Sequence, residues 1–98
     1  MLVRIVKMTF QKDKINNFEA LFDEVKHKIR NSPGCRLLEL YQDQNNPQVF
    51  FTYSYWVAEE DLENYRHSPL FNEVWTKTKA MFAGKPEAWS VDKKVSLK

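Results

Sequence analysis

The sequence has little of several residue types on which particular functions depend. Its 98 residues include two glycines and one cysteine, Cys35. With so few glycines no phosphate-binding loop can be drawn, and a single cysteine can form no disulfide within the chain. No secretory leader is recognisable, and no apolar run approaches the roughly 18 residues that a membrane span requires. We therefore expect a cytoplasmic protein with no membrane partner.

Metal ligands and clustered positive charge are equally scarce. The two histidines, His27 and His67, are far apart in the sequence and have no cysteine or histidine at ligand spacing. The 15 basic residues are scattered and nearly balanced by 13 acidic ones, which leaves a net charge of +2. A nucleic-acid binder usually carries a basic stripe or a recognisable module. We predict neither a metal site nor a nucleic-acid partner.

Aromatic residues, in contrast, are abundant: seven Phe, four Tyr and three Trp. Each large ring buries roughly 150–250 Å² and can fill a core, an interface or a ligand pocket. Many of these rings fall between Tyr41 and Trp75. The clustering favours a pocket, although the rings could equally belong to the core.

Hydrophobic periodicity predicts elements in the order βαββαβ, with the second helical region split in two. The expected strands are Leu2–Phe10, Cys35–Asp43, Val49–Val57 and Ala88 to about Leu97, the last with a frayed polar end. The expected helices are one from about Asp13 that ends at Ser32-Pro33-Gly34, a short one over Glu59–Arg66, and one that restarts with Ser68 as cap and Pro69 at its first position. This is the α+β, ferredoxin-like arrangement, in which a four-stranded antiparallel sheet carries its helices on one face. We predict one domain that spans residues 1–98.

The predicted sheet is apolar on both faces. In the strand Val49–Val57, alternate side chains point to opposite faces, so Tyr53 and Trp56 lie on different sides, and both sides are aromatic. Helices cover only one face, and large uncovered apolar patches are rare on monomers. We therefore expect a homodimer formed through the second face of the sheet.

The stretch from Thr52 to Phe71, TYSYWVAEEDLENYRHSPLF, resembles the antibiotic biosynthesis monooxygenase (ABM) domain family. The shared features are a strand that ends in an aromatic residue, an acidic loop, a short helix and a Ser-Pro restart. Trp56, Leu62 and Ser68 occupy matching positions. The resemblance extends over nearly the whole chain and implies a dimeric α+β barrel.

Two positions depart from the family pattern. Ser54 stands where an acidic residue is usual, and Tyr65 stands where a histidine is usual. In the haem-degrading relatives, a histidine at the position of Trp75 ligates iron. Because Trp75 has no imidazole, the resemblance disfavours haem binding.

The resemblance implies a cofactor-independent monooxygenase in which O2 reacts directly with a small quinol-like or polyphenolic ring. The expected substrate-binding residues are the aromatic side chains Tyr53, Trp56, Phe71 and Trp75. The expected catalytic residues are Tyr65, whose hydroxyl can hold a developing oxyanion, and His67, the one nearby candidate for a general base. His67 stands two residues past the family's histidine position, so its role is not carried over from the family.

Other interpretations of the same residues remain open. Phe71 and Trp75 lie on a helical apolar stripe and could be core residues, while Arg66 and His67 could be solvated surface groups. The missing polar groups at positions 54 and 65 favour a second hypothesis, a non-enzymatic dimer that binds a small aromatic ligand or has a regulatory role.

Overall fold

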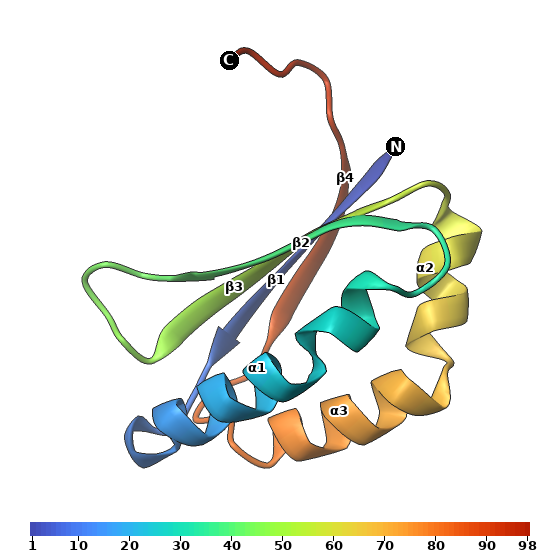
Figure 1. The fold of residues 1–98 in the computed structure, drawn as a ribbon. Helices are drawn as coiled ribbons and strands as arrows, with labels where there is room; N and C mark the ends of the chain where they lie inside the picture. Colours follow the sequence, from blue (N-terminus) through green and yellow to red (C-terminus); the bar gives the residue numbers. More distant parts are fainter.

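The computed structural model describes all 98 residues, Met1 to Lys98. One antiparallel sheet lies over three helices, which all cover the same face (Figure 1). The elements are β1 (Leu2–Thr9), a short 3-10 helix (Lys12–Lys14), α1 (Ile15–Arg30), β2 (Cys35–Gln42), β3 (Val49–Trp56), α2 (Glu59–Arg66), α3 (Pro69–Lys79) and β4 (Glu87–Asp92). The strand order β2-β3-β1-β4 confirms the predicted ferredoxin-like α+β fold.

The last strand is shorter than the sequence predicts. The strand β4 ends at Asp92, and residues 93–98 have no regular structure. The strand β1 is the only neighbour of β4, and their pairing stops at Leu2 opposite Asp92 because β1 itself begins there. Beyond that point the backbone has no ladder partner, so the tail leaves the sheet (Figure 1).

The apolar stripe of α1 packs on the sheet as its helical spacing predicts. Phe18, Val25 and Ile29 are buried, and Phe18 stacks on Phe10, the residue after β1, with 4.1 Å between ring centroids. Phe10 has no exposed surface and also contacts Phe50 edge-on. This cluster closes one end of the space between the helices and the sheet. None of the three helices is both long and apolar enough to cross a membrane.

The opposite face of the sheet is covered by no element of the chain (Figure 1). The register places Tyr53 beside Ile5 on this face, with Trp89 on the far side of Ile5. Tyr41 and Trp89 are 49% and 42% exposed, which is high for large aromatic side chains in a sheet. We call this surface the outer face of the sheet.

Candidate active site

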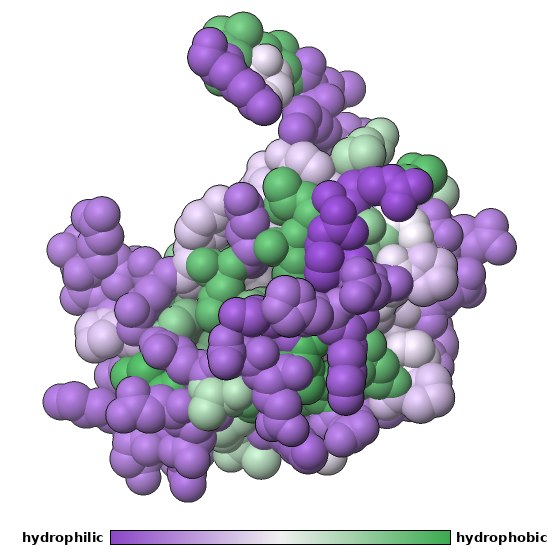
Figure 2. Space-filling model, viewed as in Figure 1, coloured by the Kyte–Doolittle hydropathy of each residue, from purple (hydrophilic) through white to green (hydrophobic).

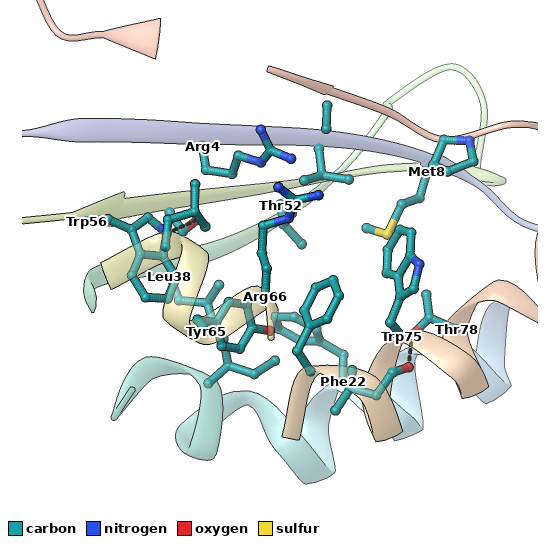
Figure 3. Close-up of a pocket in the computed structure, with 18 of the residues that line it drawn as sticks. Arg4, Met8, Phe22, Leu38, Thr52, Trp56, Tyr65, Arg66, Trp75 and Thr78 are labelled. Atoms are coloured by element: carbon teal, nitrogen blue, oxygen red, sulfur yellow. Dashed lines mark hydrogen bonds between the residues drawn. The ribbon is translucent and has the colours of Figure 1, made fainter. Parts of the chain in front are cut away.

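A cavity of about 280 Å³ lies between the sheet and the helices, on the face opposite the outer one. Thirteen of its 20 lining residues are hydrophobic, so its walls suit an apolar or aromatic ligand. Figure 2 shows hydrophobic residues (green) gathered between the sheet and the helices, with hydrophilic residues (purple) around them. Figure 3 shows side chains from the sheet and from the helices pointing into the same space.

Four aromatic side chains form a continuous wall of this cavity. Trp56 at the end of β3 stacks on Tyr65 of α2, with 5.1 Å between ring centroids. Tyr65 meets Phe71 of α3 edge-on, and Phe71 stacks on Trp75 at 5.7 Å. All four line the cavity, so the structure brings together four of the six site residues expected from the sequence.

The corner between α2 and α3 fixes two of these rings. Ser68 caps α3: its Oγ accepts a hydrogen bond from the backbone N–H of Phe71 at 3.1 Å, as is typical of helix N-termini. The same hydroxyl donates to the backbone carbonyl of Tyr65 at 2.6 Å. Pro69, whose fixed φ suits a first helical position, follows directly. One serine therefore sets the relative position of Tyr65 and Phe71.

Ser54 has a structural role beside Trp56. The Nε1–H of Trp56 donates to Ser54 Oγ at 3.0 Å, and both side chains are buried. A buried indole N–H without a partner would be costly, and no buried side-chain polar atom in the chain lacks one. This hydrogen bond holds the Trp56 ring in its orientation.

Tyr65 is the one ionisable phenol in the cavity wall. Burial, with a smaller contribution from Cys35, raises the pKa of Tyr65 to about 12. The group is therefore protonated near neutral pH and acts as a hydrogen-bond donor rather than as a base. Its hydroxyl donates to no other protein group, which leaves it available to a ligand in the cavity.

The structure does not place Tyr53 and His67 at the cavity. Tyr53 points to the outer face, because it occupies the opposite phase of β3 from Ser54 and Trp56. His67 follows the last residue of α2, and its side chain is 77% exposed. Its Nδ1 lies 2.8 Å from the Glu63 carbonyl oxygen of its own helix. The expected grouping of six residues is corrected to four.

Two arginines line the cavity instead. Arg4 points from β1 into this space, and Arg66 reaches toward it from the end of α2 (Figure 3). Burial lowers the pKa of Arg4, and the nearby Arg66 cation lowers it further. The sequence does contain a signal for Arg4: it lies at an even position of the strand, like the apolar Val6 and Met8, so its side chain points to the same face of the sheet. Arg66, expected to be a surface charge, lies at the cavity.

No group of three His, Cys, Asp or Glu side chains lies close enough to hold a metal ion. The groups that line the cavity are aromatic faces, the phenol of Tyr65, the guanidinium groups of Arg4 and Arg66, the hydroxyls of Thr52, Ser54 and Thr78, and Glu87. Such a set can stack against a ring and donate hydrogen bonds to its oxygen atoms.

One family model matches most of the chain. The profile of the family described as "antibiotic biosynthesis monooxygenase" matches residues 1–77. No curated protein sequence matches the chain.

Solved structures share the fold. One is an antibiotic biosynthesis monooxygenase with a TM-score of 0.89 and 22% identity, over 95% of this chain and 98% of that one. A conserved protein from Methanosarcina mazei Go1 has a TM-score of 0.88 and 22% identity, over 96% and 94% of the two chains. A variant of SnoaB, a cofactor-independent oxygenase from Streptomyces nogalater, has a TM-score of 0.87 and 14% identity, over 98% and 95%.

Proposed function

We propose, because the chain belongs to the antibiotic biosynthesis monooxygenase family, that it is a monooxygenase. The substrate would be a small aromatic compound of the quinol or polyphenol type, and O2 would react with it without a cofactor. The observation that carries this proposal is the continuous wall of Trp56, Tyr65, Phe71 and Trp75 around a cavity of about 280 Å³.

The proposed reaction balances without an external reductant. A hydroquinone and O2 give a hydroxyquinone and water: one oxygen atom enters the ring and the other leaves as water. The substrate supplies the electrons and the two hydrogen atoms that the water contains. The protein then has to orient the ring, stabilise its ionised form and restrict access of bulk water. The aromatic wall is suited to the first task, and the Tyr65 donor to the second.

One feature of the cavity favours the alternative, a protein that binds an aromatic ligand without transforming it. No histidine lines the cavity, and its one carboxylate, Glu87, lies in the strand phase opposite to the cavity-lining Ala88. The raised pKa of Tyr65 keeps this phenol protonated near neutral pH, so it cannot serve as the base. His67, the base expected from the sequence, is exposed outside the cavity. A reaction would need a substrate that ionises readily in this site.

The test of the proposal is oxygen uptake with a panel of hydroquinones and polyphenols. With 18O2, a monooxygenase must place one labelled atom in the product and the other in water. The variant Ala88→Phe should abolish uptake, because Ala88 lines the cavity and a benzyl group there would occupy part of its volume. Ala20→Phe adds the same group on the exposed side of α1 and should retain uptake.

Uptake no greater than the spontaneous oxidation of the panel would overturn the monooxygenase proposal. Calorimetry with the same compounds then decides the alternative: binding that Ala88→Phe abolishes and Ala20→Phe preserves would support a ligand-binding protein. Uptake that is equal in both variants would show that the reaction does not take place in this cavity.

We also propose that two copies of the chain associate through the outer face of the sheet, as the dimeric α+β barrel of the family implies. Tyr41, Tyr53 and Trp89 on this face are exposed or partly exposed rings, and none of the chain's helices covers them. Removing such apolar surface from water stabilises association by roughly 25 cal/mol per Å² before its entropic costs. The cytoplasmic location expected from the sequence remains a prediction.

Sedimentation equilibrium tests the dimer. The wild-type chain should have twice its protomer mass of 11.7 kDa. Tyr53→Glu places a carboxylate at the centre of the outer face, and twice in a symmetric interface, so this variant should be monomeric. Asn17→Glu, on the exposed side of α1, should remain dimeric. A monomeric wild type, or a dimeric Tyr53→Glu, would exclude this interface.

A further inference from the structure

Arg4 is an unpaired cation in the cavity wall. It takes part in none of the four ion pairs of the chain, and its only hydrogen bond to another side chain runs from Nη1 to Ser90 Oγ at 3.0 Å. A guanidinium group has five N–H donors. Partial burial removes water from Arg4, and the pKa of the group is accordingly lowered. The remaining donors of Arg4 have no acceptor in the protein.

A second guanidinium lies close to the first. Arg66 extends from the last turn of α2 toward the sheet, and both cations approach the same part of the cavity (Figure 3). Arg66 is paired with Glu63, whose Oε1 is 3.0 Å from Nη1, but both side chains of this pair are nearly half exposed. Glu63 offsets the repulsion at Arg4 only in part, since desolvation and Arg66 outweigh it.

No negative charge projects from the sheet into the cavity to balance these cations. Glu87 is the one acidic residue of the lining. It pairs with Lys7 in the sheet register, in the phase whose side chains point to the outer face. The surroundings of Arg4 on the cavity side are therefore cationic, with aromatic walls, although the whole chain carries a net charge of only +2.

We propose that this cavity selects the ionised form of a phenolic ring, whose negatively charged oxygen accepts hydrogen bonds from Arg4 and Arg66 while the ring packs against the aromatic wall. Hydrogen bonds between ionised partners are about twice as strong as neutral ones. The arginine pair then takes the place of the missing base, because the site favours the deprotonated substrate by stabilising it. The inference deepens the proposed function, but the binding preference itself requires no turnover.

The probe for this inference is 4-nitrophenol, whose ionised form is coloured and which is not a hydroquinone. Under argon, at a protein concentration that saturates the probe, absorbance is followed as a function of pH. Bound to the wild-type protein, the probe should show a pKa lowered by about one unit, which is a tenfold preference for the phenolate over the phenol. The methyl ether 4-nitroanisole, which cannot ionise, should bind no better to wild type than to the Arg4 variants.

Substitutions at three positions assign the effect. Arg4→Met keeps an unbranched side chain but removes the charge and should abolish the shift, whereas Arg4→Lys should restore part of it. Arg66→Met should reduce the shift. Arg36→Met removes an exposed guanidinium that does not line the cavity and should leave the shift unchanged. Circular dichroism and thermal unfolding confirm that each variant is folded, and Arg4→Lys gives a second folded variant for comparison.

The outcomes separate this inference from the proposed function. A probe pKa that is unchanged or raised on binding to wild type would overturn the inference, and so would a shift that survives in Arg4→Met. A lowered pKa with no oxygen uptake on the hydroquinone panel would keep the anion site and remove the monooxygenase. Oxygen uptake with no change in the probe pKa would do the reverse.

Discussion

The ionisation of Tyr65 provides a direct test of the cavity's environment. The variant Tyr65→Phe removes only the hydroxyl from the ring that stacks between Trp56 and Phe71. The pKa of Tyr65 is raised from 10.0 to about 12, chiefly by burial. A difference of two pKa units corresponds to about 2.7 kcal/mol between the two protonation states.

The sign of the effect on stability follows from which state loses its proton first. As pH rises above 10, the unfolded chain releases the Tyr65 proton while the folded chain keeps it until about pH 12. The unfolded state then binds fewer protons, so the free energy of unfolding decreases with pH across this window. Relative to Tyr65→Phe, the wild type should lose up to about 2.7 kcal/mol of stability between these two pH values.

Two measurements check this expectation. Absorbance titration of tyrosinate in both proteins should show one tyrosine that is present only in the wild type and ionises with a pKa of about 12. Urea unfolding of both proteins, near neutral pH and at about pH 11, should show the wild type losing stability relative to Tyr65→Phe. Tyr55→Phe is the control: the Lys93 ammonium lowers the pKa of Tyr55, so this variant should lose the tyrosine that ionises first.

The reasoning would be refuted if the tyrosine that the Tyr65→Phe variant loses has a pKa at or below 10.0 in the wild type, because water would then reach the Tyr65 hydroxyl freely. An equal fall in stability for the two proteins above neutral pH would refute it as well. Either result would also remove the argument that Tyr65 is a proton donor in the candidate site.

Two further substitutions test how the fold positions the site. Gly34 has φ of +82°, and a Cβ there would overlap the Asp61 carboxyl group. Gly34→Ala should therefore lower the free energy of unfolding by about 1–3 kcal/mol in urea titrations. The control Gly84→Ala, whose Cβ would meet only ordinary contacts, should lower it by less. Ser68→Ala should lower the free energy of unfolding by about 1 kcal/mol, because the helix loses its cap. The same variant should weaken ligand binding in calorimetry, since the cap also holds Phe71. Unchanged stability in either would contradict the corresponding local geometry.

Local chemistry in the sequence was enough to predict most of the fold. The three-to-four spacing of Phe22, Val25 and Ile29 predicts α1, since a helix brings those positions onto one face. Ser68 and Pro69 predict where α3 begins, because capping and a fixed φ act within one helical turn. The end of β4 was not predictable in this way: it depends on where β1 begins, and strand pairing joins segments far apart in the chain.

The candidate site, like the fold, could be predicted from the sequence only in part. Alternation along β3 determined that Tyr53 and Trp56 lie on opposite faces of the sheet, as the register confirms. Only the tertiary structure decided which of those faces the helices cover, and hence that Trp56 lines the cavity while Tyr53 does not. It also turned His67 outward and brought Arg4 and Arg66 together. Hydrophobic periodicity assigns a side chain to a face, but contacts between distant residues arise only when the helices dock on the sheet.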